Sequence, residues 1–143
     1  MGCGAKQLGL WKTIVNLSIE DLSKYYIDAL INKNTKEIWQ FTSFYGEPET
    51  CRRSEAWAKL RRLNSHPNIP WFCAGNFNEI LKHDAKLGGA LRNHSQMQLF
   101  REVIDECGFI DLGFVGPKFT WSRYYANGHS IWERINKSLA TNS

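Results

Sequence analysis

Two amide side chains follow a short apolar run in the middle of the chain. Asn76 and Asn78 come directly after Trp71–Ala74 and Gly75. In an extended segment, residues two apart point to the same side. The pair could therefore donate to anionic oxygens and accept from a hydrated cation, but neither amide can take a proton from water. An ordinary turn is the competing interpretation, because Gly and Asn are common turn residues.

The elements that must position this pair begin with strands. Alternating apolar and polar residues predict strands over Val15–Glu20, Tyr25–Ile31 and Ile38–Tyr45, and a short polar loop joins the last two as a hairpin. The continuous apolarity of Trp71–Ala74 predicts a central strand covered on both faces. The first third of the chain therefore reads as an antiparallel meander, and the amides lie at the rim of a sheet.

Helical periodicity appears twice. The first predicted helix has a buried face that comprises Ala56, Trp57, Leu60 and Leu63. The second begins with a capping box at Ser95–Gln98 and ends at Gly108. Its expected buried stripe comprises Leu99, Phe100, Val103, Ile104 and Cys107.

A hairpin is predicted near the end of the chain. Asn127-Gly128 is a strong turn signal between the candidate strands Lys118–Ser122 and Ile131–Ile135. The whole order of strands and helices predicts an α+β layered sandwich.

Composition limits the classes of protein. The chain has 143 residues, of which 43% are hydrophobic and 13% aromatic, which excludes a disordered chain. No apolar run approaches the roughly 20 residues of a membrane span, and the start lacks the apolar core of a secretory signal. The net charge of +4 permits a polyanionic partner such as DNA without requiring one.

The four cysteines are far apart and no histidine stands near them at ligand spacing, which argues against a zinc site. Reduced thiols are the default for such a chain. We therefore expect a nuclear or cytoplasmic protein that is not secreted and contacts no membrane.

Several motifs follow one another in an order that resembles a known family. They are Phe44–Thr50, Pro70–Ile80, Gly88-Gly89, Ser95–Met97 and, with gaps, Gly108–Trp121. Together they resemble the endonuclease domain encoded by non-LTR (LINE-type) retroelements abundant in plant genomes, within the endonuclease/exonuclease/phosphatase superfamily. The resemblance runs from about Leu8 to the end of the chain.

This resemblance implies a fold like deoxyribonuclease I, with two packed sheets flanked by helices and an active site at one sheet edge. It also implies Mg²⁺-dependent hydrolysis of phosphodiester bonds in DNA. In that chemistry a metal neutralises the phosphate, a carboxylate activates water and a His stabilises the charged phosphorus centre. Such elements use the nick to start reverse transcription.

The resemblance assigns roles to four residues of this chain. Tyr45 matches a tyrosine that faces the phosphate, although a core aromatic is an equally good interpretation. Asn78 matches a residue that holds the phosphate or positions the base. Asn76 stands where the family has its catalytic Asp, and Asn136 stands where the family has the Asp that orients the catalytic His.

The family's metal-binding Glu and its catalytic His match nothing in this chain, so residues 1–143 are expected to form a partial domain, truncated at both ends. The expected function is a degenerate, inactive endonuclease fragment that does not bind Mg²⁺ tightly. One alternative is a non-catalytic nucleic-acid-binding module that keeps the phosphate-facing groove. Another is a fragment without autonomous stability, because missing outer strands would leave sheet edges exposed.

Overall fold

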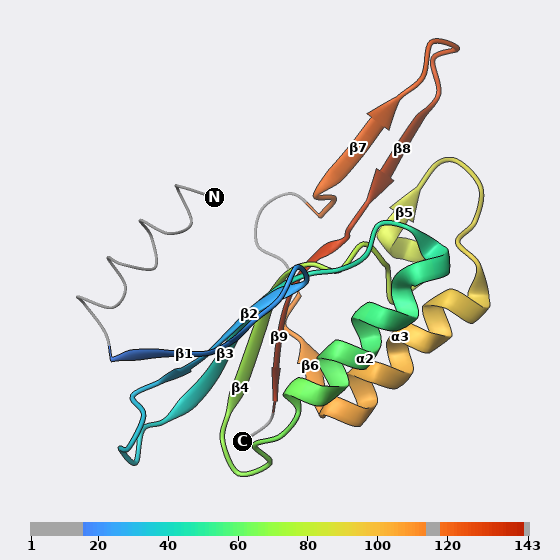
Figure 1. Ribbon diagram of the computed structural model, residues 1–143. Helices are drawn as coiled ribbons and strands as arrows, with labels where there is room; N and C mark the ends of the chain where they lie inside the picture. The colour runs from blue at the N-terminus through green and yellow to red at the C-terminus, as the bar shows by residue number, and fades with distance from the viewer. Residues whose placement is uncertain (1–15, 114–117, 142–143) are drawn as a thin grey trace.

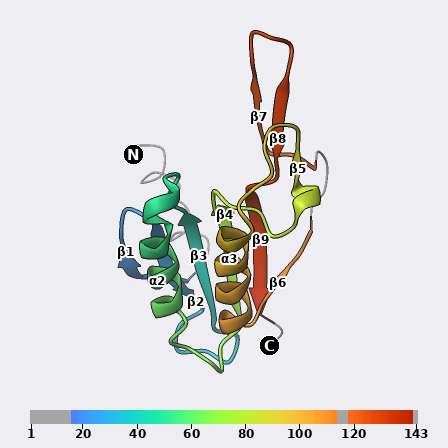
Figure 2. The same ribbon diagram turned by 90° about the vertical axis from the view of Figure 1, so that its right-hand side faces the viewer.

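The computed structural model describes residues 16–113 and 118–141. A six-stranded mixed sheet with the order β1-β2-β3-β4-β9-β6 forms the body of the molecule, and helices α2 and α3 lie on one of its faces (Figure 1; Figure 2). A smaller sheet, ordered β5-β8-β7, projects from one end of the body (Figure 1). The described residues thus form an α+β fold, as the sequence predicts.

The elements of the main sheet are β1 (Leu17–Leu22), β2 (Tyr26–Ile31), β3 (Trp39–Tyr45), β4 (Trp71–Asn76), β6 (Phe109–Asp111) and β9 (Asn136–Thr141). The helices are α2 (Arg53–Leu63) and α3 (His94–Cys107), with short 3₁₀ turns η1 (Thr50–Arg52) and η2 (His83–Ala85). The small sheet consists of β5 (Lys86–Leu87), β7 (Trp121–Tyr124) and β8 (Ser130–Glu133).

The first three strands form the predicted antiparallel meander. The first strand is shifted from its predicted range, and Val15 lies outside the described residues. Helix α2 then returns the chain so that β4 joins β3 in parallel. The sequence did not predict β6 or β9, yet β9 lies between β4 and β6 and pairs with both. A strand rich in Asn, Lys and Ser carries no strong strand signal of its own, so only its neighbours select it.

Aromatic rings fill the space between the sheet and the helices. Trp57 of α2 stacks on Phe100 of α3 with ring centroids 4.7 Å apart, and Phe44 of β3 stacks on Phe77 at 5.2 Å. All four side chains are at most 2% exposed. This aromatic layer packs the helices against the sheet. Phe77 belongs to the loop that follows β4, so the layer also contacts that loop.

Two expectations for α3 are wrong. The helix begins with Asn93 as its N-cap, whose Oδ1 accepts from the Gln96 N–H at 3.2 Å, in place of the predicted capping box at Ser95. Asn is as good a cap as Ser, so the sequence offers two starts that are two residues apart. Leu99 is 41% exposed, and Met97 takes the expected place in the buried stripe. Gly108 ends the helix in the left-handed conformation, as predicted.

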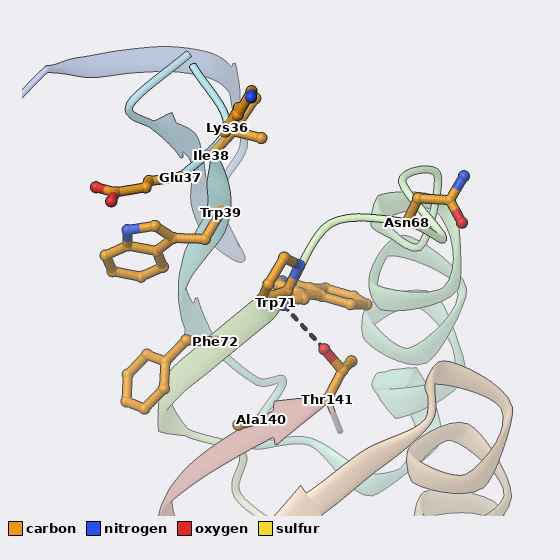
Figure 3. Close-up of a pocket in the computed structure, with 10 residues that line it drawn as sticks. Lys36, Glu37, Ile38, Trp39, Asn68, Trp71, Phe72, Ala140 and Thr141 are labelled. Atoms are coloured by element: carbon orange, nitrogen blue, oxygen red, sulfur yellow. Dashed lines mark hydrogen bonds between the residues drawn. The ribbon is translucent and has the colours of Figure 1, made fainter. Parts of the chain in front are cut away.

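The prediction that β4 is covered on both faces is also wrong. Trp71 and Cys73 are buried under the helices, whereas Phe72 on the other face is only partly buried. Figure 3 shows Trp39 and Phe72 on this second face, while Trp71 points toward the helices. The backbone N–H of Trp71 donates to Thr141 Oγ1 over 2.9 Å. A shallow hollow of about 490 Å³ opens here. An apolar face of this kind is consistent with the prediction of limited autonomous stability, which stays a prediction.

The hairpin of β7 and β8 confirms the turn signal at Asn127-Gly128. β7 starts and ends later than predicted, and β8 starts one residue earlier. β8 ends earlier than predicted because the chain leaves it at Glu133 to enter β9. No helix in the described part of the chain is long and apolar enough to cross a membrane.

Candidate functional site

Three of the predicted site residues occupy one row across three neighbouring strands. Tyr45 at the end of β3 pairs with Asn76 at the end of β4, and Asn76 pairs with Asn136 at the start of β9. Paired residues on neighbouring strands share a face of the sheet and lie about 5 Å apart, so the row spans about 10 Å. We call Tyr45, Asn76 and Asn136 the rim row.

The fourth residue, Asn78, lies just after β4 and forms hydrogen bonds to Asn76 and Gly46. Its backbone N–H donates to Asn76 Oδ1 over 2.9 Å, and its Nδ2 donates to the Gly46 carbonyl oxygen over 2.7 Å. The Gly46 N–H donates in turn to the Asn76 carbonyl oxygen over 2.6 Å. The ends of β3 and β4 are therefore locked together by both backbone and side-chain hydrogen bonds.

The expectation that Asn76 and Asn78 point to the same side of an extended strand is wrong. The strand ends at Asn76, and Asn78 has a φ of 57° in the left-handed region. Asn tolerates that region better than most residues do. The two amides are related by a hydrogen-bonded turn, so the turn interpretation holds for Asn78 while Asn76 still belongs to the rim row.

Two glycines allow the close approach that builds this rim. A Cβ at Gly75, whose φ is 144°, would lie 1.9 Å from the Phe44 carbonyl oxygen. A Cβ at Gly46 would lie 2.4 Å from the Phe77 carbonyl oxygen. Any side chain at either position would push β3 away from the loop after β4.

The third member of the rim row is held from the side of β9. Thr120 Oγ1 accepts from the N–H of Asn136 at 3.1 Å and lies 3.3 Å from that of Ile135. The Phe77 N–H donates to the Ile135 carbonyl oxygen at 3.0 Å. The connection between β8 and β9 is thus tied to the loop after β4.

The rim row is open to solvent. Tyr45 is 53% exposed, which rules out the interpretation of this residue as a core aromatic. Asn136 is exposed, and Asn76 and Asn78 are partly buried. The row can therefore be reached by a ligand that approaches the end of the sheet.

Behind the rim lies a chain of buried charges that the sequence did not reveal. Glu79 is fully buried, and its Oε2 accepts from Arg53 Nη1 at 2.8 Å while its Oε1 lies 3.8 Å from Arg92 Nε. Arg92 also pairs with Glu133. We call Arg53, Glu79, Arg92 and Glu133 the inner ionic cluster. These residues come from four separate segments, so no spacing in the sequence could have joined them.

Lys137 is a second buried cation that the sequence did not single out. Its Nζ donates to the carbonyl oxygens of Glu79 at 2.6 Å and Arg134 at 2.9 Å. Burial lowers the pKa of Lys137 to about 7, and the nearby Arg134 adds to that effect. The ammonium group therefore ties the loop after β4 to the start of β9 from inside the molecule.

An ion pair anchors the other side of β9. Arg134 donates through both terminal nitrogens to the Asp111 carboxylate, each at 2.8 Å. Burial alone would raise the pKa of Asp111, but these hydrogen bonds and one from the Gly113 N–H hold it below its ordinary value. Asp111 is thus a charged structural partner, well suited to hold Arg134 in place.

A groove of about 560 Å³ runs from Asn78 toward the small sheet. Its lining includes the cation Lys86, the inner ionic cluster and the aromatic residues Trp121 and Tyr125. The two aromatic side chains are 38% and 41% exposed. Exposed aromatic rings combined with cations are typical of surfaces that bind nucleic acid.

The donors of the rim row do not fit a magnesium ion. Mg²⁺ prefers carboxylate oxygens in octahedral geometry, whereas the row offers a phenol and two amides. Over residues 16–113 and 118–141, no group of three or more His, Cys, Asp or Glu side chains is arranged to hold a metal. The row can donate hydrogen bonds to an anion, but it holds no group that takes a proton from water near neutral pH.

Comparisons with known proteins identify the fold. No protein-family model matches the chain, and no curated protein matches it significantly. Among solved structures, the endonuclease domain of TRAS1, a telomere-specific non-LTR retrotransposon, superposes with a TM-score of 0.63 at 14% identity. That match covers 89% of this chain and 57% of the TRAS1 structure.

Two further structures agree. The 3′ phosphatase NExo (D146N) from Neisseria, bound to a product DNA hairpin, has a TM-score of 0.63 at 15% identity over 90% of this chain and 58% of its own. A beta toxin from Staphylococcus aureus has a TM-score of 0.54 at 14% identity over 83% of this chain and 43% of its own. The chain has the DNase I-like fold of the endonuclease/exonuclease/phosphatase domains and spans between 43% and 58% of the length of these three structures.

Proposed function

We propose that this chain carries the phosphate-facing part of an endonuclease-like domain of the LINE retroelement type, and that the chain does not cleave phosphodiester bonds by itself. The likeness to the TRAS1 endonuclease supports the type of domain. The alignment of Tyr45, Asn76 and Asn136 in one row supports the position of the site.

The chemistry of the rim row is the main support for inactivity. At Asn76 and Asn136 an amide stands where the family resemblance calls for Asp, and an amide neither activates water nor holds Mg²⁺ tightly. The loss of one general base typically costs about 10²–10⁴-fold in rate. No residue of this chain matches the family's metal-binding Glu or its catalytic His, so the three working parts of the mechanism are missing together.

Nicking of supercoiled plasmid DNA in Mg²⁺ tests this proposal. We expect no conversion to open circles by the native chain, and none after Asn76→Asp combined with Asn136→Asp, because the metal ligand and the His are still missing. Conversion by the native chain that is lost in the Asn78→Ala variant would overturn the proposal. The Asn78→Ala control separates genuine activity from a contaminating nuclease, which would cleave in both preparations.

A second candidate is a nucleic-acid-binding module without chemistry. The groove beside Asn78, which is lined by Lys86 and by the two exposed aromatic side chains of Trp121 and Tyr125, favours it. Binding to DNA that weakens steeply with salt, with no cleavage, would support this candidate. Binding that does not change with salt would argue against phosphate contacts. A nuclear or cytoplasmic location belongs to either candidate, in keeping with the free thiols of Cys51, Cys73 and Cys107.

A further inference from the structure

The hydrogen bonds of the rim fix which way the Asn76 amide faces. Its Oδ1 accepts the Asn78 N–H at 2.9 Å, and only the oxygen end of an amide can accept that bond. The Nδ2 end is therefore the one left to face outward. Neither this Nδ2, nor the Tyr45 hydroxyl, nor the Asn136 amide bonds to another residue in the described part of the chain.

A carboxylate at position 76 would present a negative charge to a ligand, where the native amide presents a neutral hydrogen-bond donor. One Asp oxygen could accept the Asn78 N–H, and the other would then face outward with a negative charge. Such a group repels a phosphate oxygen unless a cation lies between them. The native amide donates a hydrogen bond from the same place and needs no intervening cation. The same reasoning applies to Asn136, which is next to Asn76 in the row.

We infer that the rim row binds a phosphate group of a nucleic acid directly through neutral hydrogen-bond donors, with no divalent cation. This inference rests on the proposed location of the site and concerns the role of the metal there. The Tyr45 hydroxyl and the two amides span about 10 Å across neighbouring strands, which is wide enough to contact one phosphate and its neighbours in the backbone. The groove lined by Lys86, Trp121 and Tyr125 continues from Asn78 and would follow that backbone. Mg²⁺ then gives no gain in affinity and competes weakly by screening the DNA.

Fluorescence anisotropy of a labelled short DNA duplex, at constant ionic strength, tests this inference with the full chain. The native chain should bind equally well or slightly better in EDTA than in millimolar Mg²⁺. Asn76→Asp combined with Asn136→Asp should weaken binding in EDTA by about tenfold or more. Mg²⁺ should restore part of that loss, so the sign of the metal effect reverses between the two proteins.

A charge-matched control separates a local effect from overall repulsion. Asn34→Asp combined with Asn68→Asp adds the same two negative charges. These residues lie in the segments just before β3 and β4, at the end of the sheet away from the rim. This control should change affinity by less than about twofold after salt screening. The single variant Asn136→Asp changes an exposed residue, so it supplies the same test should the double rim variant fail to fold.

Three results would overturn the inference. They are an absolute need for Mg²⁺ in binding by the native chain, no binding by the native chain in either buffer, and equal affinity of the native and rim-Asp variants in EDTA. None of these results would produce plasmid nicking. Failure of this inference is therefore distinct from failure of the proposed function, which only cleavage by the native chain would show.

Discussion

Two regions that share the loop after β4 hold their polar groups in opposite ways. The rim row is exposed and uncharged, and its outward-facing groups make no bonds to the described protein. The inner ionic cluster is charged and mostly buried, and Glu79 at its centre contacts both Arg53 and Arg92. Buried charges must be paired because their desolvation is costly, whereas exposed amides carry no such requirement. We therefore expect the stability of the fold to depend more on the cluster than on the side chains of the rim row.

The largest expected effect breaks the inner cluster. Glu79→Ala leaves the guanidinium of Arg53 buried without its partner, and such a loss costs about 3–5 kcal/mol. Asn136→Ala at the exposed rim should change stability by less than about 0.5 kcal/mol. Urea unfolding monitored by tryptophan fluorescence measures both.

The exposed ion pair Arg61–Glu106, with side chains 39% and 54% exposed, provides a matched control for this first prediction. Glu106→Ala should cost at most about 1 kcal/mol. If Glu79→Ala cost no more than Glu106→Ala, the contrast between the two regions would be wrong.

A smaller effect is expected at the junction between the two regions. Gly75→Ala places a Cβ against the Phe44 carbonyl oxygen and should cost more than about 2 kcal/mol. Gly108, also at positive φ, has nothing within 4 Å of its added Cβ, so Gly108→Ala should cost only about 1 kcal/mol. Equal losses in thermal or urea unfolding would show that β3 and the loop after β4 are free to separate.

The smallest effect concerns the pH dependence that Lys137 contributes. Its folded pKa is lowered to about 7 by burial, while an unfolded lysine titrates near pH 10.4. Between these values the unfolded chain binds more protons, so this contribution to stability rises with pH and is lost as the pH falls toward 7. The expected slope is about 1 kcal/mol per pH unit.

The Lys137→Met variant isolates this slope. Subtracting its unfolding free energy from that of the native chain, measured between about pH 7 and 8.5, should leave the rising contribution of Lys137. The raised pKa values of Cys73 and Cys107 act in both proteins and cancel in the difference. A difference that stayed flat with pH would show that burial does not lower the pKa of Lys137 in the folded chain.

The amino-acid sequence determined the local elements. Alternation, helical periodicity, a continuous apolar run and an Asn-Gly turn signal placed the meander, both helices, the strand before Gly75 and the turn at Asn127-Gly128, because these signals act over a few neighbouring residues. The sequence also determined which groups the rim offers. The amides of Asn76 and Asn136 can donate hydrogen bonds but cannot take a proton from water. The boundaries were less accurate where two good caps compete, as at Asn93 and Ser95.

Only the tertiary structure decided which residues meet. β9 has no strong strand pattern of its own, and it becomes part of the sheet because β4 and β6 offer it hydrogen-bonding edges. That pairing is what places Asn136 beside Asn76, and Glu79 acquires its partners from segments distant in the chain. Contacts between distant segments depend on packing and on the desolvation of charges, and no local pattern of residues encodes either of them.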